Sequence, residues 1–91
     1  MNKERIDIGS MIEEQDINLL DDLEGFNIIK EKQVGFDGEK GFCHLETVIQ
    51  RKSDNKYFLV EWTDYGHGRT NLEECEAIEV FKKEKTIVTY E

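Results

Sequence analysis

Four side chains in the sequence, Cys43, His44, His67 and Cys75, carry the ligand atoms and nucleophiles that metal sites and thiol catalysis require. A zinc site needs three or four such ligands within about 2.0–2.3 Å of one ion. Cys43 and His44 are neighbours in a strand-like run, so alternation directs them to opposite faces. Neither cysteine belongs to a C-x-x-C pair or a nucleophile elbow. We therefore expect free thiols in a reducing compartment, no metal, no cofactor and no enzymatic activity.

Charge is the strongest compositional feature of the chain. Its 91 residues include 21 acids and 12 bases, for a formal net charge of −9. A surface of this sign repels phosphate backbones, so direct binding to nucleic acid is not expected. Residues 1–25 hold eight acids and two bases, residues 26–60 five and six, and residues 61–91 eight and four. Two interpretations stay open: an acidic face that only keeps the protein soluble, and one that meets a basic partner.

The second interpretation predicts a non-enzymatic interaction module that binds a protein partner with a basic, nucleic-acid-binding surface. Nine lysines against three arginines and no proline indicate an AT-rich coding genome, such as that of a low-GC bacterium, its phages or its plasmids. We therefore expect a small inhibitor or regulator of the phage or plasmid type. The sequence does not indicate its oligomeric state.

The residues expected to contact the partner are Asp21, Asp22, Glu24, Arg69, Glu73, Glu74 and Glu76. The carboxylates are chosen because they cluster before Gly25 and after the loop Gly66-His67-Gly68. Arg69 is chosen because a glycine-flanked hairpin tip can present an arginine as an anchor.

The run FLVEWTDY, residues 58–65, is similar to the YLVKWxGY strand of chromodomains at four positions, two of them the aromatic Trp62 and Tyr65. The resemblance covers eight residues, and residues 70–73, TNLE, stand where the family has T-W-E-P. In chromodomains, aromatic residues at these two positions help to enclose a methylated lysine by cation–π contact. The resemblance therefore implies an alternative function, a reader of a peptide or methylated lysine that uses Trp62 and Tyr65.

The elements that position these residues are organised around residues 45–65. Two strand-like runs meet there across the turn formers at 53–55, so we predict a β-hairpin. A two-residue turn would place Ile49 opposite Val60. Alternation then puts Ile49, Val60 and Trp62 on one face, and we predict that this face is core.

An amphipathic helix is expected before this hairpin. Ser10 and Glu13 fit an S-x-x-E capping box, and Gly25 is a natural residue to follow a helix end. Apolar residues recur between them at helical spacing, and the acids fall largely outside that stripe. Asp16 interrupts the stripe, so a helix that starts there is the alternative. Residues 1–9 are predicted to be a flexible arm or at most a short edge strand.

Strand signals fill the rest of the chain. Alternation predicts a strand of nine to eleven residues from Phe26, and three glycines in residues 35–41 predict a turn before a strand that starts at Phe42. Apolar runs at 77–81 and 86–90 predict either a terminal hairpin or one long bent strand.

These elements predict an α+β fold over residues 10–91, a single small domain. The N-terminal helix is expected to pack on a four- or five-stranded antiparallel β-meander or half-open barrel. The sequence holds neither a signal-peptide h-region nor an apolar run of transmembrane length, so a cytoplasmic protein is expected.

Overall fold

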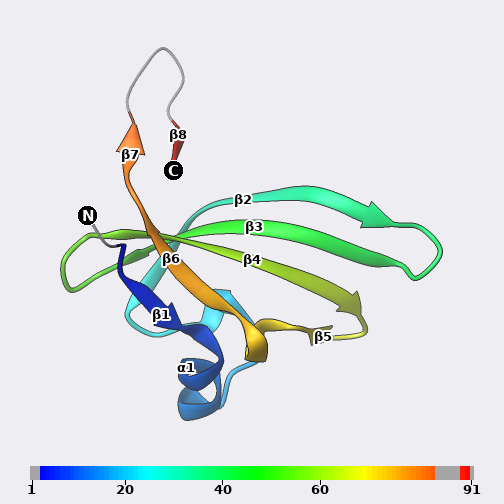
Figure 1. Ribbon diagram of the computed structural model, residues 1–91. Helices are drawn as coiled ribbons and strands as arrows, with labels where there is room; N and C mark the ends of the chain where they lie inside the picture. Colours follow the sequence, from blue (N-terminus) through cyan, green and yellow to red (C-terminus); the bar gives the residue numbers. More distant parts are fainter. Residues whose placement is uncertain (1–2, 84–88, 91) are drawn as a thin grey trace.

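The computed structural model describes residues 3–83 and 89–90 (Figure 1). In chain order the elements are β1 (Arg5–Asp7), α1 (Ile8–Gln15), the 3₁₀ turn η1 (Leu20–Asp22), β2 (Phe26–Asp37), β3 (Phe42–Arg51), β4 (Tyr57–Gly66), β5 (Arg69–Thr70), the 3₁₀ turn η2 (Leu72–Glu74), β6 (Glu76–Val80), β7 (Lys82–Lys83) and β8 (Thr89–Tyr90). One six-stranded antiparallel sheet has the order β1-β6-β4-β3-β2, with β5 paired to β4. The predicted α+β class with an antiparallel sheet is confirmed, and the sheet is larger than the four or five strands expected.

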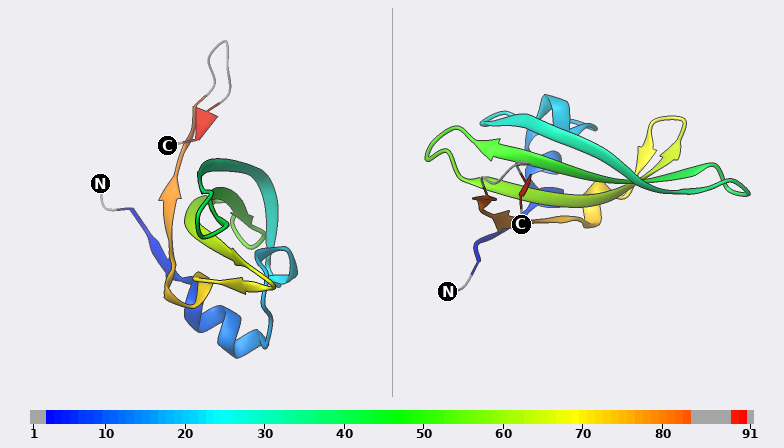
Figure 2. Two further views of the ribbon diagram at one scale, coloured as in Figure 1. Left: turned by 90° about the vertical axis from the view of Figure 1, so that its right-hand side faces the viewer. Right: turned by 90° about the horizontal axis from the view of Figure 1, so that it is seen from above.

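The sheet is strongly curved, and α1 lies beneath its β1 and β6 side (Figures 1 and 2). Strands β2, β3 and β4 follow one another as antiparallel hairpins, and the long β2–β3 hairpin projects away from α1. The segment 1–9, expected to be an arm or an edge strand, contains β1, in which Ile6 pairs with Ala77 of β6. This pairing brings the start of α1 close to β6, which lies in the C-terminal part of the chain.

The central hairpin forms where it was predicted, with a different register. Ile49 pairs with Phe58, whereas a two-residue turn would have paired it with Val60. The turn is longer because the Arg51 N–H donates to the Lys56 carbonyl at 2.9 Å, which leaves residues 52–55 as the loop. The register shift is two residues, so each side chain keeps its predicted face.

The predicted helix bounds are wrong at both ends. Helix α1 begins at Ile8, with Asp7 as its N-cap. The Asp7 carboxylate accepts hydrogen bonds from the Ser10 N–H at 3.1 Å and from the Ser10 hydroxyl at 2.8 Å. Ser10 therefore donates to the cap and is not itself the cap. The helix ends at Asp16, which adopts φ 54°, and the Ile17 N–H returns to the Ile12 carbonyl at 3.1 Å. This closure is a Schellman motif, in which a left-handed aspartate replaces the expected glycine.

One buried cluster joins the sheet, α1 and both 3₁₀ turns. Its members are Ile8, Ile12, Leu20, Leu23, Ile49, Phe58, Val60, Trp62, Leu72, Cys75 and Ala77. The prediction that Ile49, Val60 and Trp62 are core residues is confirmed, because each is at most 9% exposed. The side chains of α1 and of the central hairpin thus share one core.

Gly9 sets the distance between α1 and η2. A Cβ atom at this position would lie 2.0 Å from the carbonyl oxygen of Glu73, which is closer than any side chain tolerates. Only glycine therefore permits this approach of the two backbones.

The C-terminal apolar runs fall partly outside the described residues. Strand β6 ends at Val80, and β7 pairs with β8 through Lys82 and Tyr90 and through Lys83 and Thr89. The part of the second predicted run within 84–88 lies outside the described residues.

Candidate functional site

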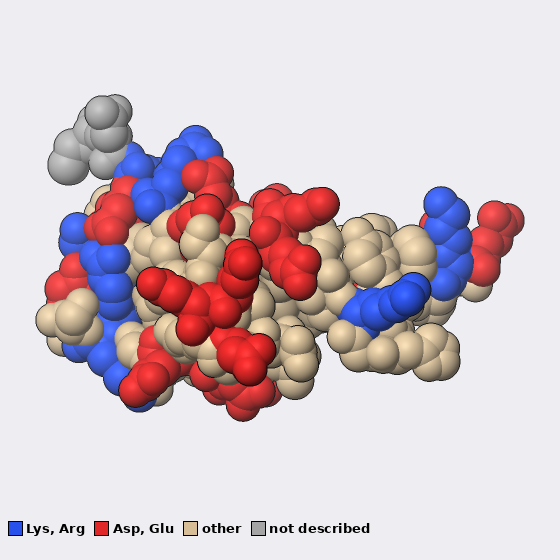
Figure 3. Space-filling view, turned by 90° about the horizontal axis from the view of Figure 1, so that it is seen from below, with Lys and Arg blue, Asp and Glu red and all other residues tan. Residues whose placement is uncertain are grey.

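The acids predicted to meet a partner lie on the two 3₁₀ turns and beside them, and not on α1. Asp21 and Asp22 belong to η1, and Glu73 and Glu74 belong to η2. All six carboxylates, those of Asp21, Asp22, Glu24, Glu73, Glu74 and Glu76, are on exposed residues. Seen from below, acidic side chains gather over the part of the molecule that carries α1, and most basic ones lie toward its margins (Figure 3).

Five of these six carboxylates lack an ion pair within residues 3–81. The exception is Glu76, whose Oε2 lies 3.4 Å from Arg5 Nη1 on the exposed edge of β1. Arg69, the predicted anchor, is also exposed and forms no ion pair with any residue that the structure describes. These charged groups are therefore available to a partner.

A hollow of about 480 Å³ lies between α1 and η2, and its walls are acidic. The carboxylate-bearing residues Asp7, Glu13, Asp16 and Glu73 line it, and neither lysine nor arginine does. Hydrogen bonds from the Ser10 hydroxyl and N–H lower the pKa of Asp7, so this carboxylate stays ionised at neutral pH. Four carboxylates around one hollow attract a cationic side chain.

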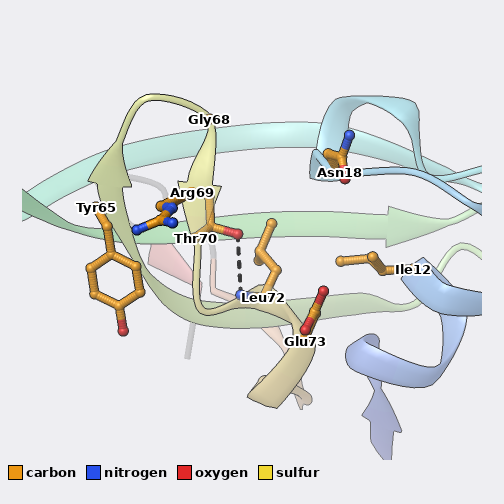
Figure 4. Close-up of a pocket in the computed structure, with 8 residues that line it drawn as sticks. All are labelled: Ile12, Asn18, Tyr65, Gly68, Arg69, Thr70, Leu72 and Glu73. Carbon is orange, nitrogen blue, oxygen red and sulfur yellow. Dashed lines mark hydrogen bonds between the residues drawn. The ribbon is translucent and has the colours of Figure 1, made fainter.

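A second hollow, of about 330 Å³, shares part of its wall with the acidic hollow (Figure 4). Ile12, Asn18 and Glu73 line both. The Thr70 hydroxyl accepts a hydrogen bond from the Leu72 N–H at 3.3 Å, which holds the turn from β5 into η2. Tyr65, Gly68 and Arg69 complete the wall at the end away from Ile12.

Tyr65 and Arg69 also line a third hollow, of about 470 Å³, together with Phe42, Gly66 and His67. The Phe42 and Tyr65 rings meet edge to face, with centroids 4.7 Å apart and planes at 65°. Their apolar surface makes this end of the site suited to an uncharged group.

The loop that carries Arg69 is shaped by left-handed backbone. Gly66 and Gly68 have φ of 85° and 78°, and His67 between them has φ of 56°. Glycine adopts these angles without strain, so the Gly-x-Gly pattern allows β4 to turn at once into β5.

The three adjoining hollows form one site, which we call the groove. Its acidic end consists of Asp7, Glu13, Asp16 and Glu73, and its aromatic end of Phe42, Tyr65 and Arg69. Of the residues predicted from the sequence, Glu73, Arg69 and Tyr65 line it. Asp21, Asp22, Glu24, Glu74 and Glu76 are exposed outside the residues that line these hollows.

The sequence reasoning missed Asp7, Glu13, Asp16 and Phe42 as groove residues. The sequence predicts Glu13 on the charged face of a longer helix and Asp16 as an interruption of the apolar stripe of that helix. The sequence offered one signal for this site, Gly9 close to Asp7. A glycine in the first turn of a helix indicates that another segment of backbone approaches the helix closely there.

The aromatic pair implied by the chromodomain resemblance lies in two different environments. Trp62 is 9% exposed, and its indole N–H donates to the Thr47 hydroxyl at 2.9 Å inside the core. Tyr65 is 37% exposed and packs on Phe42. Trp62 lines a hollow beside Val34, away from the groove that Tyr65 lines. The structure therefore does not bring the two rings around one cation.

The cysteines and histidines occupy separate places. Cys75 is buried, which raises the pKa of its thiol, with a further contribution from the charge of Glu74. His44 is exposed, with Nδ1 2.9 Å from the Thr63 hydroxyl, and His67 lies on the β4–β5 loop. Within the described part of the chain, no three His, Cys, Asp or Glu side chains converge as metal ligands.

A second charged cluster, which we call the Arg51 network, surrounds the β3–β4 turn. The Arg51 guanidinium donates to both Glu4 oxygens, at 2.6 and 2.9 Å, and to both Asp54 oxygens, at 3.0 and 2.7 Å. Lys56 Nζ lies 3.4 Å from Glu4 and 3.9 Å from Glu79.

The hydrogen bonds of Arg51 change the pKa of Glu4, of Asp54 and of Arg51 itself. Hydrogen bonds from Arg51 lower the pKa of Asp54 from 3.8 to about 2 and also lower the pKa of Glu4. The bonds to Glu4 and then Asp54 raise the pKa of Arg51. The network therefore fastens the N-terminal segment to the central hairpin at neutral pH.

Comparison with protein-family models, with curated proteins and with solved structures gave no significant match. No helix within the described residues is long and apolar enough to cross a membrane.

Proposed function

We propose that the protein is a non-enzymatic interaction module whose groove binds a basic segment of a protein partner. The observation that carries this proposal is the acidic end of the groove, where four carboxylate-bearing residues line one hollow that no lysine or arginine lines. Like charges held together lower the stability of a fold, and such a cost is typically retained where it serves binding.

The four carboxylates of the acidic end support a protein partner with a Lys- or Arg-rich surface. Nucleic-acid-binding proteins present such surfaces, because they neutralise phosphates with the same side chains. A small acidic protein that occupies such a surface competes with nucleic acid for it. The proposed role is therefore that of an inhibitor or regulator of the phage or plasmid type, which acts by occupancy and carries out no catalysis.

Retention of a partner on charge variants tests this proposal. The groove variant carries Glu13→Gln, Asp16→Asn and Glu73→Gln, which preserve side-chain shape while removing three charges; asparagine also tolerates the left-handed backbone at position 16. Immobilised wild-type protein is expected to retain a basic protein from a lysate of the native host. The groove variant is expected to lose that protein, as identified by mass spectrometry, and nucleic acid is expected to displace it from the wild type.

The matched control removes three charges elsewhere, by Glu39→Gln, Glu46→Gln and Glu61→Gln. These residues lie on the β2–β3 turn and the central hairpin, and they form no ion pair within residues 3–81. The control is expected to retain the partner. A third variant, with Asp21→Asn, Asp22→Asn and Glu24→Gln, measures the wider acidic face and is expected to weaken retention less than the groove variant. Equal losses from the groove variant and the control would contradict the proposal, because net charge alone would then explain binding.

A further inference from the structure

The two ends of the groove differ in charge as well as in chemistry. The acidic end holds four carboxylates, whereas the aromatic end holds one guanidinium, that of Arg69, and the apolar surface of Phe42 and Tyr65. Lys40 adds to this difference, because its Nζ lies 5.9 Å from the centre of the Phe42 ring. The charged side chains that line the two ends are therefore of opposite sign.

We propose that the aromatic end is a second subsite, which takes an aromatic side chain from the same partner segment that places its Lys or Arg residues in the acidic end. This inference rests on the proposed function, and it adds both the composition of the segment and its direction in the groove. Shared lining residues support this inference. Ile12, Asn18 and Glu73 line both the acidic hollow and the second, central one, and Tyr65 and Arg69 line both the central hollow and the aromatic one.

The chemistry of the aromatic end selects an uncharged ring. The guanidinium of Arg69 repels a lysine or arginine of the partner, and it can stack on an aromatic face. The Phe42 and Tyr65 rings already meet edge to face, an arrangement that a third ring can extend. A segment whose cations were at this end would place like charges together and leave the acidic end without a partner.

The aromatic subsite is also built before any ligand arrives. Phe42 begins β3 and Tyr65 lies near the end of β4, and adjacent residues of these strands, Cys43 and Asp64, are paired in the sheet. The Asp64 carboxylate accepts from the Gly66 N–H at 2.8 Å, which fixes the start of the loop. A pre-formed subsite loses little conformational entropy on binding.

Paired synthetic peptides test the inference. Each probe has four lysines, a spacer of two, four, six or eight glycines, and a final Trp or Ala. Binding to the full ¹⁵N-labelled chain is followed by NMR at low ionic strength. At the best spacer, the Trp probe is expected to bind on the order of tenfold more tightly than its Ala twin. The additional shifts are expected at the backbone amides of Tyr65 to Arg69.

Two substitutions distinguish binding at the aromatic subsite from non-specific hydrophobic binding of the Trp probe. Tyr65→Ser is expected to remove the difference in affinity between the Trp probe and the Ala probe. Phe36→Ser is the matched control, because Phe36 is a more exposed ring, at 60%, and lines none of the three hollows of the groove. The gain is expected to survive in this control.

The outcomes distinguish this inference from the function on which it rests. Equal affinity of the Trp and Ala probes at every spacer, or a gain that persists in Tyr65→Ser, overturns the aromatic subsite alone, provided that the Ala probe binds in a salt-dependent way. Failure of both probes to bind contradicts the basic-segment function and, with it, the subsite.

Discussion

Two groups of carboxylates in this protein have opposite surroundings. Near the β3–β4 turn, Glu4 and Asp54 share the guanidinium of Arg51 in bonds of 2.6 to 3.0 Å. In the groove, Glu13 and Glu73 line one hollow without an ion pair to any described residue. The first arrangement fastens two segments of the chain together, whereas the second leaves negative charge exposed.

This difference shows that the acidic composition has more than one role. The lowered pKa values of Glu4 and Asp54 indicate that their charged forms are stabilised by folding. Among the described side chains, no cation pairs with the groove carboxylates Glu13, Asp16 and Glu73, so their removal is expected to affect binding more than stability. Substitutions in the two regions are therefore expected to separate these effects.

The largest expected effect comes from a substitution that blocks the close approach of α1 to η2, the two elements on either side of the acidic hollow. Gly9→Ala places a Cβ against the Glu73 carbonyl, so α1 and η2 must move apart at a cost of about 3 kcal/mol. Gly38→Ala is the matched control, since its Cβ would meet only Phe36, at 3.8 Å, and it is expected to change stability by less than about 0.5 kcal/mol. Denaturant unfolding measures both. A Gly9→Ala protein as stable as the control would refute the close packing of α1 on η2.

The next largest effect is expected in the Arg51 network. Arg51→Met keeps an apolar stem near the Phe58 ring, over which the guanidinium lies at 5.0 Å, and removes the bonds to Glu4 and Asp54. The expected loss is about 1–2 kcal/mol, because the pairs are charged but partly exposed to solvent. Lys52→Met removes a neighbouring exposed cation that has no ion pair within residues 3–81. If both variants lose the same free energy of unfolding in denaturant, the Arg51 network makes no specific contribution to stability.

Acid should weaken the same network. The pKa of Asp54 is lowered from 3.8 to about 2, and that of Glu4 is lowered from 4.5. Lowered values mean that the stabilisation is complete above the unfolded-state values and is lost as the pH falls through the folded-state values. The wild-type unfolding midpoint is therefore expected to fall more steeply between about pH 4.5 and pH 2 than that of Arg51→Met. Parallel curves for the two proteins would show that the network does not titrate as assigned.

The smallest effect is expected in the groove itself. The groove variant, Glu13→Gln, Asp16→Asn and Glu73→Gln, loses three exposed charges that have no ion pair within the described residues. Its free energy of unfolding is expected to stay within about 0.5 kcal/mol of the wild type or to rise slightly as repulsion is relieved. A clear loss of stability, measured in denaturant, would mean that these carboxylates are structural.

The strands and the core were predictable because alternation is a local property of the sequence. Ile49, Val60 and Trp62 kept their face even though the turn was longer than predicted, since a shift of two residues preserves parity. The predicted helix bounds were wrong because the sequence pattern favours Ser10 as the N-cap and Gly25 as the residue that follows the helix. Asp7 begins the helix earlier than Ser10, and Asp16 ends it in a left-handed conformation well before Gly25.

The groove could be predicted only in part. Glu73 and Arg69 were expected to bind a partner from their charge and from the adjoining Gly-x-Gly loop. Their neighbours Glu13 and Phe42 come from distant parts of the chain, and the pairing of β1 with β6 and of β3 with β4 brings them to one surface. Register between distant strands is a tertiary property, so local patterns do not contain it.

The most direct test of the account is the association rate with the captured basic partner, measured across a range of ionic strengths. Wild type and the control variant, Glu39→Gln, Glu46→Gln and Glu61→Gln, are expected to associate at similar rates that fall steeply with salt. The groove variant is expected to associate on the order of tenfold more slowly at low salt and to show a shallower salt dependence. An unchanged rate and salt slope in the groove variant would contradict the assignment of the groove as the binding site.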